Sequence, residues 1–587
     1  MSHFKMSNNS VMKKIVYLLL LACLFGCKDD LDLKPFDRIS PSTAFNTEKD
    51  LQLYVNSFYP ILPSGNEIVR GDEMSDYVVG RSLSNYISGS FTSSQATGWS
   101  WGDLRNINYF LEHYQQAQTT DEAKNHYAGV ARFFRAWFYF DKVKRFGDVP
   151  WYDRTLDVND PNLYKGRDSR AMVMDKVLED LNFASENIRS SKDNTSSQIT
   201  KWVALAFKSR VCLFEGTFRK YHPDLGLNES AGKWLGDAAT AAQQVMESGN
   251  YKINRSGAAE LSYRDLFTQE TPNSDEVILA VVANKSLRVF NDANWYYTSA
   301  TYGNRLNLTK TFVNTYLNRD GSRFTDNSGY NRVPFWEEVK NRDLRLQQTI
   351  RMGDYKRDGV AAPPDFTYTY TGYQPIKLTL DSKATDGVGE NNNSLPIIRY
   401  AEVLLNYAEA KAELKTFTEA DWNATVKVLR ERAGIENAPY PVAADPYLQE
   451  HYYPNISDPA LLEIRRERGI ELVLEGFRYD DLKRWKAGKL LEMEYDGMYV
   501  PALDELYDLN EDGKPDVSFV RQTPASKVSG VYYFLIDDSQ FKLSEGNKGN
   551  LILLSNLERS FGDYKYFYPI PFNEIVLNPA LEQNPEW

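Results

Sequence analysis

The chain has few of the residues from which cross-links and reactive sites are built. Its 587 residues include only three cysteines and five histidines. Cys23 and Cys27 lie at the end of an N-terminal apolar run, so processing and anchoring there leave Cys212 alone and exclude an intramolecular disulfide. Cys212 falls within an apolar helical pattern, which favours a buried, inert thiol over a nucleophile.

Several catalytic motifs are missing as well. The histidines are scattered without an H-E-x-x-H pair, and there is neither a G-x-S-x-G elbow nor a Walker loop. The segment "DGVGENN" offers Gly387 and Gly389 but no third glycine and no strand-to-helix setting, so we interpret it as a loop. These absences argue against an enzyme and against a catalytic cofactor.

Basic residues are outnumbered by acidic ones. The counts of 68 Lys and Arg against 80 Asp and Glu give a net charge of -12. Such a balance argues against a nucleic-acid partner, because proteins that bind nucleic acid carry basic surfaces that neutralise phosphate. With 42% hydrophobic and 25% charged residues, the composition is that of a globular chain able to bury a large core.

An apolar run from Ile15 to Phe25 follows two lysines and predicts a secretory signal. It is shorter than the roughly 20 apolar residues that span a bilayer. The segment Leu24–Cys27 resembles a bacterial lipobox, so we predict a signal peptide at 1–26 and lipidation of Cys27. Cys23 is a second candidate, and an ordinary signal peptide is the remaining alternative. The following Lys28-Asp29-Asp30 resembles the export tag of Bacteroidetes surface lipoproteins, which implies a lipid-anchored protein on the extracellular face of the outer membrane.

Helical patterns dominate the first half. In "HYAGVARFFRAWFYFDKVKRFGDVP" small and aromatic residues recur at helical spacing, and the pattern stops at Gly147 and Pro150. Similar small-residue helices are predicted in "ITKWVALAFKSRVCLFEG", "WLGDAATAAQQVMESGNY" and "RYAEVLLNYAEAKAEL". Their recurrence suggests degenerate tetratricopeptide-like repeats, which leave a curved surface free for a partner.

Other segments have strand-like or loop-like sequence patterns. "SDEVILAVVAN" predicts a short buried strand, "FTYTYTGY" alternates with period two, and "GDYKRDGVAAPPDF" is loop-like. We therefore predict a mainly α fold, one compact unit over 27–587, with a few short strands. Its helical scaffold covers about 36–250 and 395–490, a loop-rich lobe about 255–394, and a loop-rich C-terminal part about 491–587.

Several blocks resemble, in order along the chain, one family: the SusD/RagB outer-membrane lipoproteins of Bacteroidetes. They include "LDLKPFDRISPSTAFNTEKDLQLYVNSFYP", "WGDLRNINYFLE", "ARFFRAWFYFDKVKRFGDVPW", "PIIRYAEVLLNYAEAKAEL", "RRERGIELVLEGFRYDDLKRW" and "YPIPFNEIVLNPALEQNPEW". The resemblance implies a SusD-like tetratricopeptide-like scaffold and a non-catalytic protein that captures glycan and hands it to a SusC-like TonB-dependent transporter. Capture of peptides, as in RagB-like members, is the alternative, and a glycoside hydrolase is a distant third.

The hydrolase alternative depends on three carboxylates. Glu467, Glu471 and Glu475 are spaced for one helical face, and a carboxylate pair is what a glycosidase uses. Arginines lie among them in the sequence, at Arg465, Arg466, Arg468 and Arg478. We therefore predict a structural network of ion pairs that keeps the carboxylates ionised.

The segment "DLNEDGKPD" has the spacing of a calcium loop. Side-chain oxygens at positions one, three, five and nine and a backbone carbonyl at seven are the oxygen ligands that Ca²⁺ prefers, and Gly513 allows the tight turn. The predicted ligands are Asp508, Asn510, Asp512, Lys514 and Asp516. Phe519 occupies position twelve, where an EF-hand has glutamate, so we expect a structural ion, with a solvated turn as the alternative.

A glycan site needs aromatic faces beside hydrogen-bonding groups. Aromatic residues in polar loops are the best candidates, with packing at a loop base as the alternative for each. The richest stretch, "FNDANWYYTSATYGNR", contributes Asn294, Trp295, Tyr296, Tyr297 and Tyr302. Elsewhere we predict Trp99, which we expect to face outward while Trp101 is in the core, together with Tyr86 and Trp336.

Overall fold

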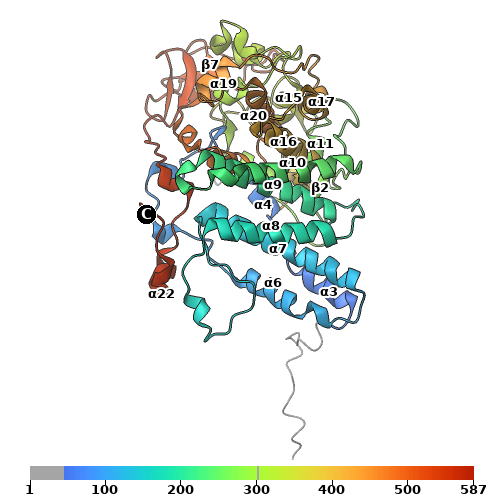
Figure 1. The fold of residues 1–587 in the computed structure, drawn as a ribbon. Coiled ribbons are helices and arrows are strands. Elements are labelled where there is room, and N and C mark those ends of the chain that lie inside the picture. The colour runs from blue at the N-terminus through green and yellow to red at the C-terminus, as the bar shows by residue number, and fades with distance from the viewer. Residues whose placement is uncertain (1–44, 300–302) are drawn as a thin grey trace, which may run out of the picture.

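Long helices build the first half of the chain. The computed structural model describes residues 45–299 and 303–587. Its helices up to residue 250 are α3 (Glu48–Asn56), α4 (Gly65–Val69), α5 (Asn85–Ser88), α6 (Gly102–His113), α7 (Asp121–Phe146), α8 (Arg170–Asn187), α9 (Lys201–Tyr221) and α10 (Ala231–Glu247). Figure 1 shows α6 to α10 stacked as successive layers.

The longest helix, α7, begins and ends where its sequence predicts. Thr120 caps its start, where the side chain accepts a hydrogen bond from the backbone N–H of Ala123. Acidic residues fill the first turn and basic residues the last, as the helix dipole favours. Gly147 ends the helix with a φ of 78°, a value that favours glycine. Because α7 packs between α6 and α8, residues all around it are buried.

Small residues let the helices approach closely, as the sequence predicts. The clearest case is Gly216 in α9, which faces α10. A Cβ atom there would lie 2.8 Å from Cγ of Leu235 and 3.0 Å from the Leu235 backbone nitrogen. Any larger residue at 216 would push these two layers apart.

The second half contains more and shorter elements. Its helices are α11 (Asp265–Thr268), α12 (Ala293–Thr298), α13 (Lys310–Val313), α14 (Phe335–Glu338), α15 (Leu344–Thr349), α16 (Tyr400–Glu413), α17 (Glu419–Ala424), α18 (Val426–Arg432), α19 (Pro446–His451), α20 (Pro459–Leu472), α21 (Arg478–Arg484) and α22 (Phe572–Leu577). Helix α16 packs on α9, α10 and α20, so these helices extend the stack begun by the first half.

The strands are short and form small sheets. They are β1 (Val78–Val79), β2 (Val277–Val281), β3 (Asn307–Leu308), β4 (Lys356–Arg357), β5 (Val360–Ala361), β6 (Leu395–Arg399), β7 (Tyr495–Val500), β8 (Val517–Val520), β9 (Tyr532–Leu535), β10 (Phe541–Leu543) and β11 (Gly549–Leu553). The pairs β1–β3, β2–β6 and β4–β5 are antiparallel, β8–β9 is parallel, and one sheet has the order β10-β11-β7. The predicted buried strand is β2.

The alternating segment 366–373 does not form a strand, contrary to its period-two pattern. Its residues form turns and bends. The carbonyl of Asp365 accepts hydrogen bonds from the backbone N–H groups of Tyr368 and Thr369, and its side chain accepts one from Thr367. Local side-chain and turn hydrogen bonds of this kind compete with strand pairing.

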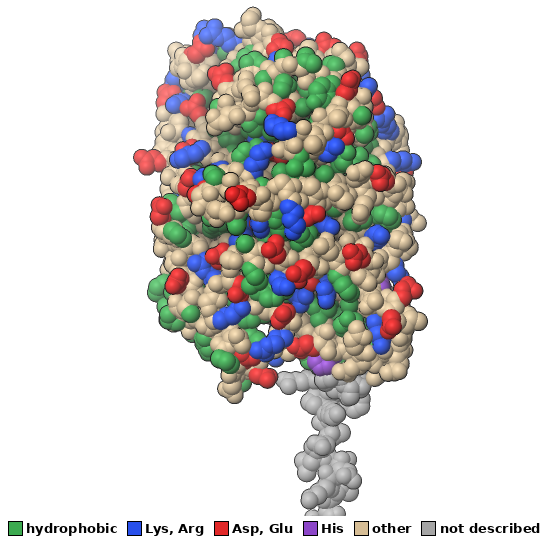
Figure 2. All heavy atoms as spheres, viewed as in Figure 1, with side chains coloured by type: hydrophobic (Ala, Val, Ile, Leu, Met, Phe, Trp, Pro, Cys, Tyr) green, Lys and Arg blue, Asp and Glu red, His purple; other side chains and the backbone are tan. Residues whose placement is uncertain are grey.

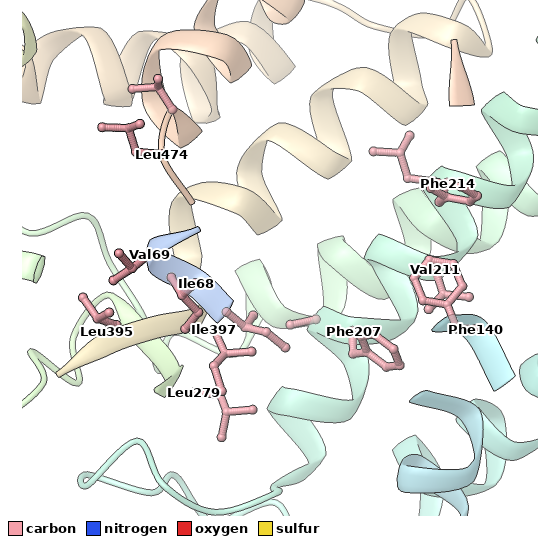
Figure 3. Close-up of a cluster of buried hydrophobic side chains, with 14 of the residues drawn as sticks. Ile68, Val69, Phe140, Phe207, Val211, Phe214, Leu279, Leu395, Ile397 and Leu474 are labelled. Atoms are coloured by element: carbon pink, nitrogen blue, oxygen red, sulfur yellow. The ribbon is translucent and has the colours of Figure 1, made fainter. Parts of the chain in front are cut away.

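One buried apolar cluster joins elements from both halves. Figure 3 shows a part of it, where side chains of α4, α7, α9, β2 and β6 meet. The C-terminal segment returns along the side of the molecule, and Figure 1 places α22 near the level of α6. On the face in Figure 2, acidic and basic side chains are interspersed. Within the described residues, no helix is both long and apolar enough to cross a bilayer.

Candidate functional site

The three carboxylates predicted on one helical face are bound to arginines. Nη1 of Arg345 lies 2.5 Å from Oε1 of Glu467 and 2.8 Å from Oε2 of Glu471. Nη1 of Arg399 lies 2.5 Å from Oε1 of Glu471, and its Nη2 lies 2.7 Å from Oε1 of Glu475. The predicted ion-pair network is therefore confirmed, although Glu475 lies beyond the end of α20.

The partners of these carboxylates differ from those predicted. They come from α15, β6 and α18, whereas the arginines of the predicted set bind other acids. The physical reason is that α20 is buried all round, so its charged side chains reach neighbouring elements on every side. Burial alone would raise the pKa of Glu471, but Arg432, Arg399 and Arg345 hold it well below its usual range. A carboxylate held in this way is unsuited to act as a general acid.

The aromatic stretch around Trp295 is mostly buried, because it forms helix α12 against α4. The Tyr297 hydroxyl donates to the Val69 carbonyl over 3.2 Å, and the buried Tyr296 hydroxyl donates to Glu73. The Asn294 side chain is fully buried and hydrogen-bonds to both backbone and side-chain groups around it. Of the described residues predicted here, only Trp295 keeps part of its surface exposed.

This arrangement corrects the prediction that Asn294, Tyr296 and Tyr297 face a ligand. Their polar side-chain atoms are already hydrogen-bonded within the protein, and the two tyrosine rings are packed in the core. The segment is polar in sequence because it contacts other buried polar loops. Tyr302 lies outside the described residues, as does Cys27.

Two further candidates are packed against other aromatic rings. Tyr86 is buried, with its ring stacked 4.3 Å from that of Tyr568 and its hydroxyl donating to the Lys565 carbonyl. The half-buried Trp336 stacks on Tyr507 at a centroid distance of 5.9 Å. For Tyr86, packing is therefore the correct interpretation, and Trp336 has only part of its surface available.

Trp99 lines a cleft, which we call the Trp99 cleft. Its volume is about 500 Å³, and it lies between the start of α6, the segment 150–164 and α22. Its aromatic residues are Trp99, Trp101, Tyr152 and Tyr164. Polar side chains of Arg105, Asn108, Arg154, Glu574 and Asn578 line the same cleft, together with several leucines.

The two tryptophans exchange their predicted positions. Trp99 is only 8% exposed and meets Phe146 edge-to-face at 4.9 Å, whereas Trp101 is the more exposed of the two. Their rings lie nearly perpendicular, with centroids 5.4 Å apart. The reason is that Trp99 fits against the C-terminal end of α7, while Trp101 stands at the exposed N-terminus of α6.

The rim of the Trp99 cleft is open. Tyr164 is 63% exposed, and the exposed Leu577 of α22 lines the same cleft. Arg154 is held by Asp160 at 2.7 Å, and the guanidinium of Arg105 donates to the Leu156 carbonyl. Aromatic side chains and fixed polar groups therefore line the Trp99 cleft, which is accessible from solvent.

Sequence reasoning missed Tyr152 and Tyr164. Both lie in "WYDRTLDVNDPNLY", a polar loop with aromatic residues, so the criterion that selected Trp99 applies to them too. The contribution of α22 could not be found in this way, because about 400 residues separate it from the loop.

A second hollow, which we call the lobe cleft, lies within the loop-rich lobe. Its volume is about 660 Å³. The β4–β5 hairpin, segments 363–368 and 383–386, and residues near β8 and β9 line it. Its wall is polar and charged, with Arg351, Arg357, Asp365, Lys383, Asp386 and Asp516 beside Tyr368 and Tyr532.

The predicted calcium loop is folded by its own side chains. The Asp508 carboxylate accepts hydrogen bonds from the backbone N–H groups of Asn510, Asp512 and Gly513. The Asp512 carboxylate accepts one from Lys514, and Asp516 accepts one from Leu509. Among the described residues, no group of three or more acidic, histidine or cysteine side chains is arranged to hold a metal. The Ca²⁺ site therefore stays a prediction.

Cys212 is fully buried in α9, as predicted. Burial raises the pKa of its thiol, which keeps it protonated and unreactive.

Comparisons with known proteins identify the class to which this fold belongs. The profile of the SusD family matches residues 275–587, and a profile described as starch-binding associating with outer membrane matches residues 31–213. The SusD-like protein P38 of Formosa agariphila is 24% identical over 507 residues, covering 80% of this chain and 90% of that protein. The SusD-like protein P2 of the same organism is 23% identical over 512 residues, covering 81% and 91%.

Solved structures share the whole fold. A SusD-like protein of Bacteroides fragilis has a TM-score of 0.67 at 22% identity, covering 94% of this chain and 100% of that one. A SusD-like carbohydrate binding protein of the same organism has a TM-score of 0.68 at 23% identity, covering 92% and 99%. The fold is thus mainly helical with a few short strands, on the tetratricopeptide-like scaffold of this class, as predicted.

The chain belongs to the SusD family. Proteins of this family bind their ligands without catalysis, in keeping with the arginine-bound carboxylates described above.

Proposed function

We propose that this protein is an outer-membrane lipoprotein that binds carbohydrate and passes it to a SusC-like TonB-dependent transporter. Support comes from the family, from the match to a profile described as starch-binding, and from a structural neighbour described as carbohydrate binding. The predicted lipidation of Cys27 would hold the folded body at the extracellular face of the membrane.

The Trp99 cleft is the observation that carries this proposal. Sugar rings present apolar C–H faces bordered by hydroxyl groups, so their sites combine aromatic surfaces with a few fixed polar groups. Trp101, Tyr152 and Tyr164 offer the aromatic surface, while Arg105 and Glu574 are available to the hydroxyl groups. A volume of about 500 Å³ is within the range of small-molecule pockets.

Migration in native gels cast with a panel of plant, mucin and microbial polysaccharides tests the proposal. The assay uses a soluble form that starts at Lys28, and Tyr164→Ala removes an exposed ring that the fold does not need. We expect retardation by a glycan and an affinity for its oligosaccharide about tenfold lower in the variant, the loss that corresponds to about 1.4 kcal/mol of aromatic contact. Leu261→Ala, a truncation of a comparably exposed side chain outside the cleft, is the matched control.

Two results would contradict the proposal. Release of new reducing ends during the assay would indicate hydrolysis in place of binding alone. Retention of a peptide panel with no retardation by any polysaccharide would favour the peptide-capturing alternative, for which the leucines of the cleft wall offer apolar contacts.

Membrane attachment is tested separately. We expect the full chain, produced in a Bacteroidetes host, to incorporate labelled palmitate and to remain on the cell surface. Cys27→Ala should abolish the label and release the protein or leave it unprocessed, whereas Cys23→Ala should retain both properties. Label that survives Cys27→Ala and disappears in Cys23→Ala would place the anchor at Cys23. Co-purification of a barrel protein with the anchored chain tests the transporter partnership.

A further inference from the structure

Arg351 is a buried cation that has no ion-pair partner among the residues that the structure describes. Its side chain lies in a residue that is 6% exposed, on the wall of the lobe cleft. Among the described residues, no carboxylate lies within ion-pair distance of it, and its buried Nε has no hydrogen-bond partner. Its side chain donates one long hydrogen bond within the described residues, from Nη1 to the Pro363 carbonyl at 3.4 Å.

Burial of the Arg351 guanidinium is energetically unfavourable unless another interaction compensates for the lost hydration. Burial of an ionised group costs free energy when no partner replaces the lost water. Burial correspondingly lowers the pKa of Arg351 below its ordinary value. The ring of Tyr355, at 5.8 Å from the guanidinium carbon, offers only a weak cation–π contact.

The backbone holds Arg351 firmly in this place. It follows α15, and its N–H donates to the Gln374 carbonyl at 2.9 Å. The neighbouring Ile350 pairs with Pro375 in an antiparallel bridge. The fixed backbone thus anchors a residue that lines the cleft, which lowers the entropy lost when a ligand binds.

The other charges of the lobe cleft are largely accounted for. Arg357 binds Asp386 at 2.6 Å, and Asn294 also donates to that carboxylate. Asp516 accepts from the Leu509 N–H, and Asp365 from the Thr367 N–H. Among the described residues of the wall, Lys383 is the second cation without an ion pair, and it is exposed at the rim.

Asp365 decides between the two possible roles of Arg351. Its carboxylate lines the same cleft, yet it does not lie within ion-pair distance of the guanidinium. An arginine placed only to support the fold would be expected to bind this carboxylate directly. The two groups instead line the same hollow of about 660 Å³ without forming an ion pair.

We propose that the lobe cleft binds an acidic sugar residue, whose anionic group is taken by Arg351 and approached from the rim by Lys383. This inference rests on the proposed carbohydrate binding and adds a ligand class and a second site. A uronic acid carboxylate and a sulfate ester share the required chemistry, because a guanidinium can donate two parallel N–H groups to either. Tyr368 and Tyr532 supply aromatic surface for the sugar ring, and Asp365 accepts from its hydroxyl groups.

Calorimetric titration of the soluble chain with defined oligosaccharides tests this inference. The probes are trigalacturonate, its fully methyl-esterified form, a sulfated disaccharide of chondroitin and maltotriose. We expect trigalacturonate or the sulfated disaccharide to bind, and the neutral methyl ester to bind at least about tenfold more weakly, as befits the loss of a charge-assisted hydrogen bond. The better of the two anions identifies the charged group.

Variants assign the binding to this cleft. Arg351→Gln should weaken binding of the anion about tenfold to a hundredfold, and Lys383→Gln should weaken it by a smaller factor. Asp365→Asn keeps an acceptor oxygen for the sugar hydroxyl groups and removes a competing negative charge, so it should strengthen binding of the anion. Arg332→Gln, a surface arginine paired with Glu545 outside the cleft, is the matched control and should change nothing.

The outcomes separate this inference from the proposed function. Unchanged affinity in both Arg351→Gln and Lys383→Gln, equal binding of the acid and its methyl ester, or binding of neither anion overturns the inference. Lys383 is exposed, so its variant remains informative even if Arg351→Gln does not fold. Retardation by a neutral glycan that is weakened by Tyr164→Ala leaves the proposed function standing in each of those cases.

Discussion

Two buried regions use arginine in opposite ways. Beneath α20, Arg345 and Arg399 are each surrounded by carboxylates at ion-pair distance. In the lobe cleft, Arg351 is nearly as buried but has no such partner among the described residues. The first arrangement holds elements from distant parts of the sequence together, whereas the second leaves hydrogen-bonding capacity unused beside an open hollow.

The presence or absence of an ion-pair partner therefore helps to distinguish buried arginines that stabilise the fold from those that could bind a ligand. A buried ion pair adds little net stability, yet removing one partner leaves the other charge buried without a partner. An unpaired buried charge has already incurred that cost, so its removal leaves stability unchanged or higher. The same Arg→Gln substitution should therefore have very different consequences in the two regions.

The largest expected effect is on the paired side. Arg345→Gln leaves Glu467, Glu471 and Asp343 without their shared cation. We expect the free energy of unfolding to fall by about 3–5 kcal/mol, the cost of breaking a buried pair by removing one partner. Urea denaturation followed by far-ultraviolet circular dichroism measures it, and a change below about 1 kcal/mol would contradict this account of the network.

Low pH should weaken the same network of ion pairs and lower the stability of the protein. Despite burial, which raises them, neighbouring cations hold the pKa values of Glu471 and Glu475 below their ordinary range. Groups with a depressed pKa in the folded state contribute stability that is present above about pH 4.3, their unfolded value, and lost as pH falls through the folded value. Urea midpoints should therefore decline below about pH 5, and less steeply in Arg345→Gln. Parallel curves for the two proteins would argue against this origin.

Like Arg351, the carboxylates of the predicted calcium ligands have no ion-pair partner within the described residues. Among the described residues, Asp508, Asp512 and Asp516 form no ion pair, and burial together with the two neighbouring carboxylates raises the pKa of Asp516 to about 6. Without metal, this raised pKa makes stability fall as pH rises from about 4 to 6.

Calcium at a hundred times its dissociation constant should raise the free energy of unfolding by up to about 2.7 kcal/mol. It should also remove the contribution of Asp516 to the pH dependence of stability between about 4 and 6. Calorimetric melting with calcium and with a chelator checks this, and Asp512→Asn should diminish the shift. Identical melting curves would leave a solvated turn as the explanation.

The smallest effect on stability should come from the unpaired arginine. Arg351→Gln is expected to change the free energy of unfolding by less than about 1 kcal/mol, or to raise it, because a desolvated charge is removed. Comparison with Arg345→Gln under the same denaturation conditions makes the contrast quantitative. A loss as large as that of Arg345→Gln would show that Arg351 supports the fold.

The scaffold could be predicted from the sequence to a large extent. Small residues at helical spacing, the cap at Thr120 and the stop at Gly147 are local signals, and they give α7 its place. The sequence predicts that these carboxylates form ion pairs with arginines, but not which arginines bind them. Arg399 and Arg432 reach Glu471 from elements that are distant in the sequence.

The candidate sites were harder to predict for the same reason. Tyr297 and Trp99 sit in similarly polar segments, yet one forms a buried helix and the other lines a cleft. The sequence period cannot tell these outcomes apart, since burial depends on which distant segment covers the loop. The lack of an ion-pair partner for Arg351 among the described residues could not be predicted from the sequence, because it depends on where the carboxylates of distant elements lie.

Hydrogen–deuterium exchange of the soluble chain, with and without a glycan that retards its migration, shows whether carbohydrate binds in the Trp99 cleft. We expect slower exchange on binding in the segments 99–105, 150–164 and 572–581, which come together in the folded Trp99 cleft. An acidic glycan should additionally slow exchange in 351–368 and 383–386. Protection confined to other segments, with these unchanged, would contradict the assignment of carbohydrate binding to the Trp99 cleft.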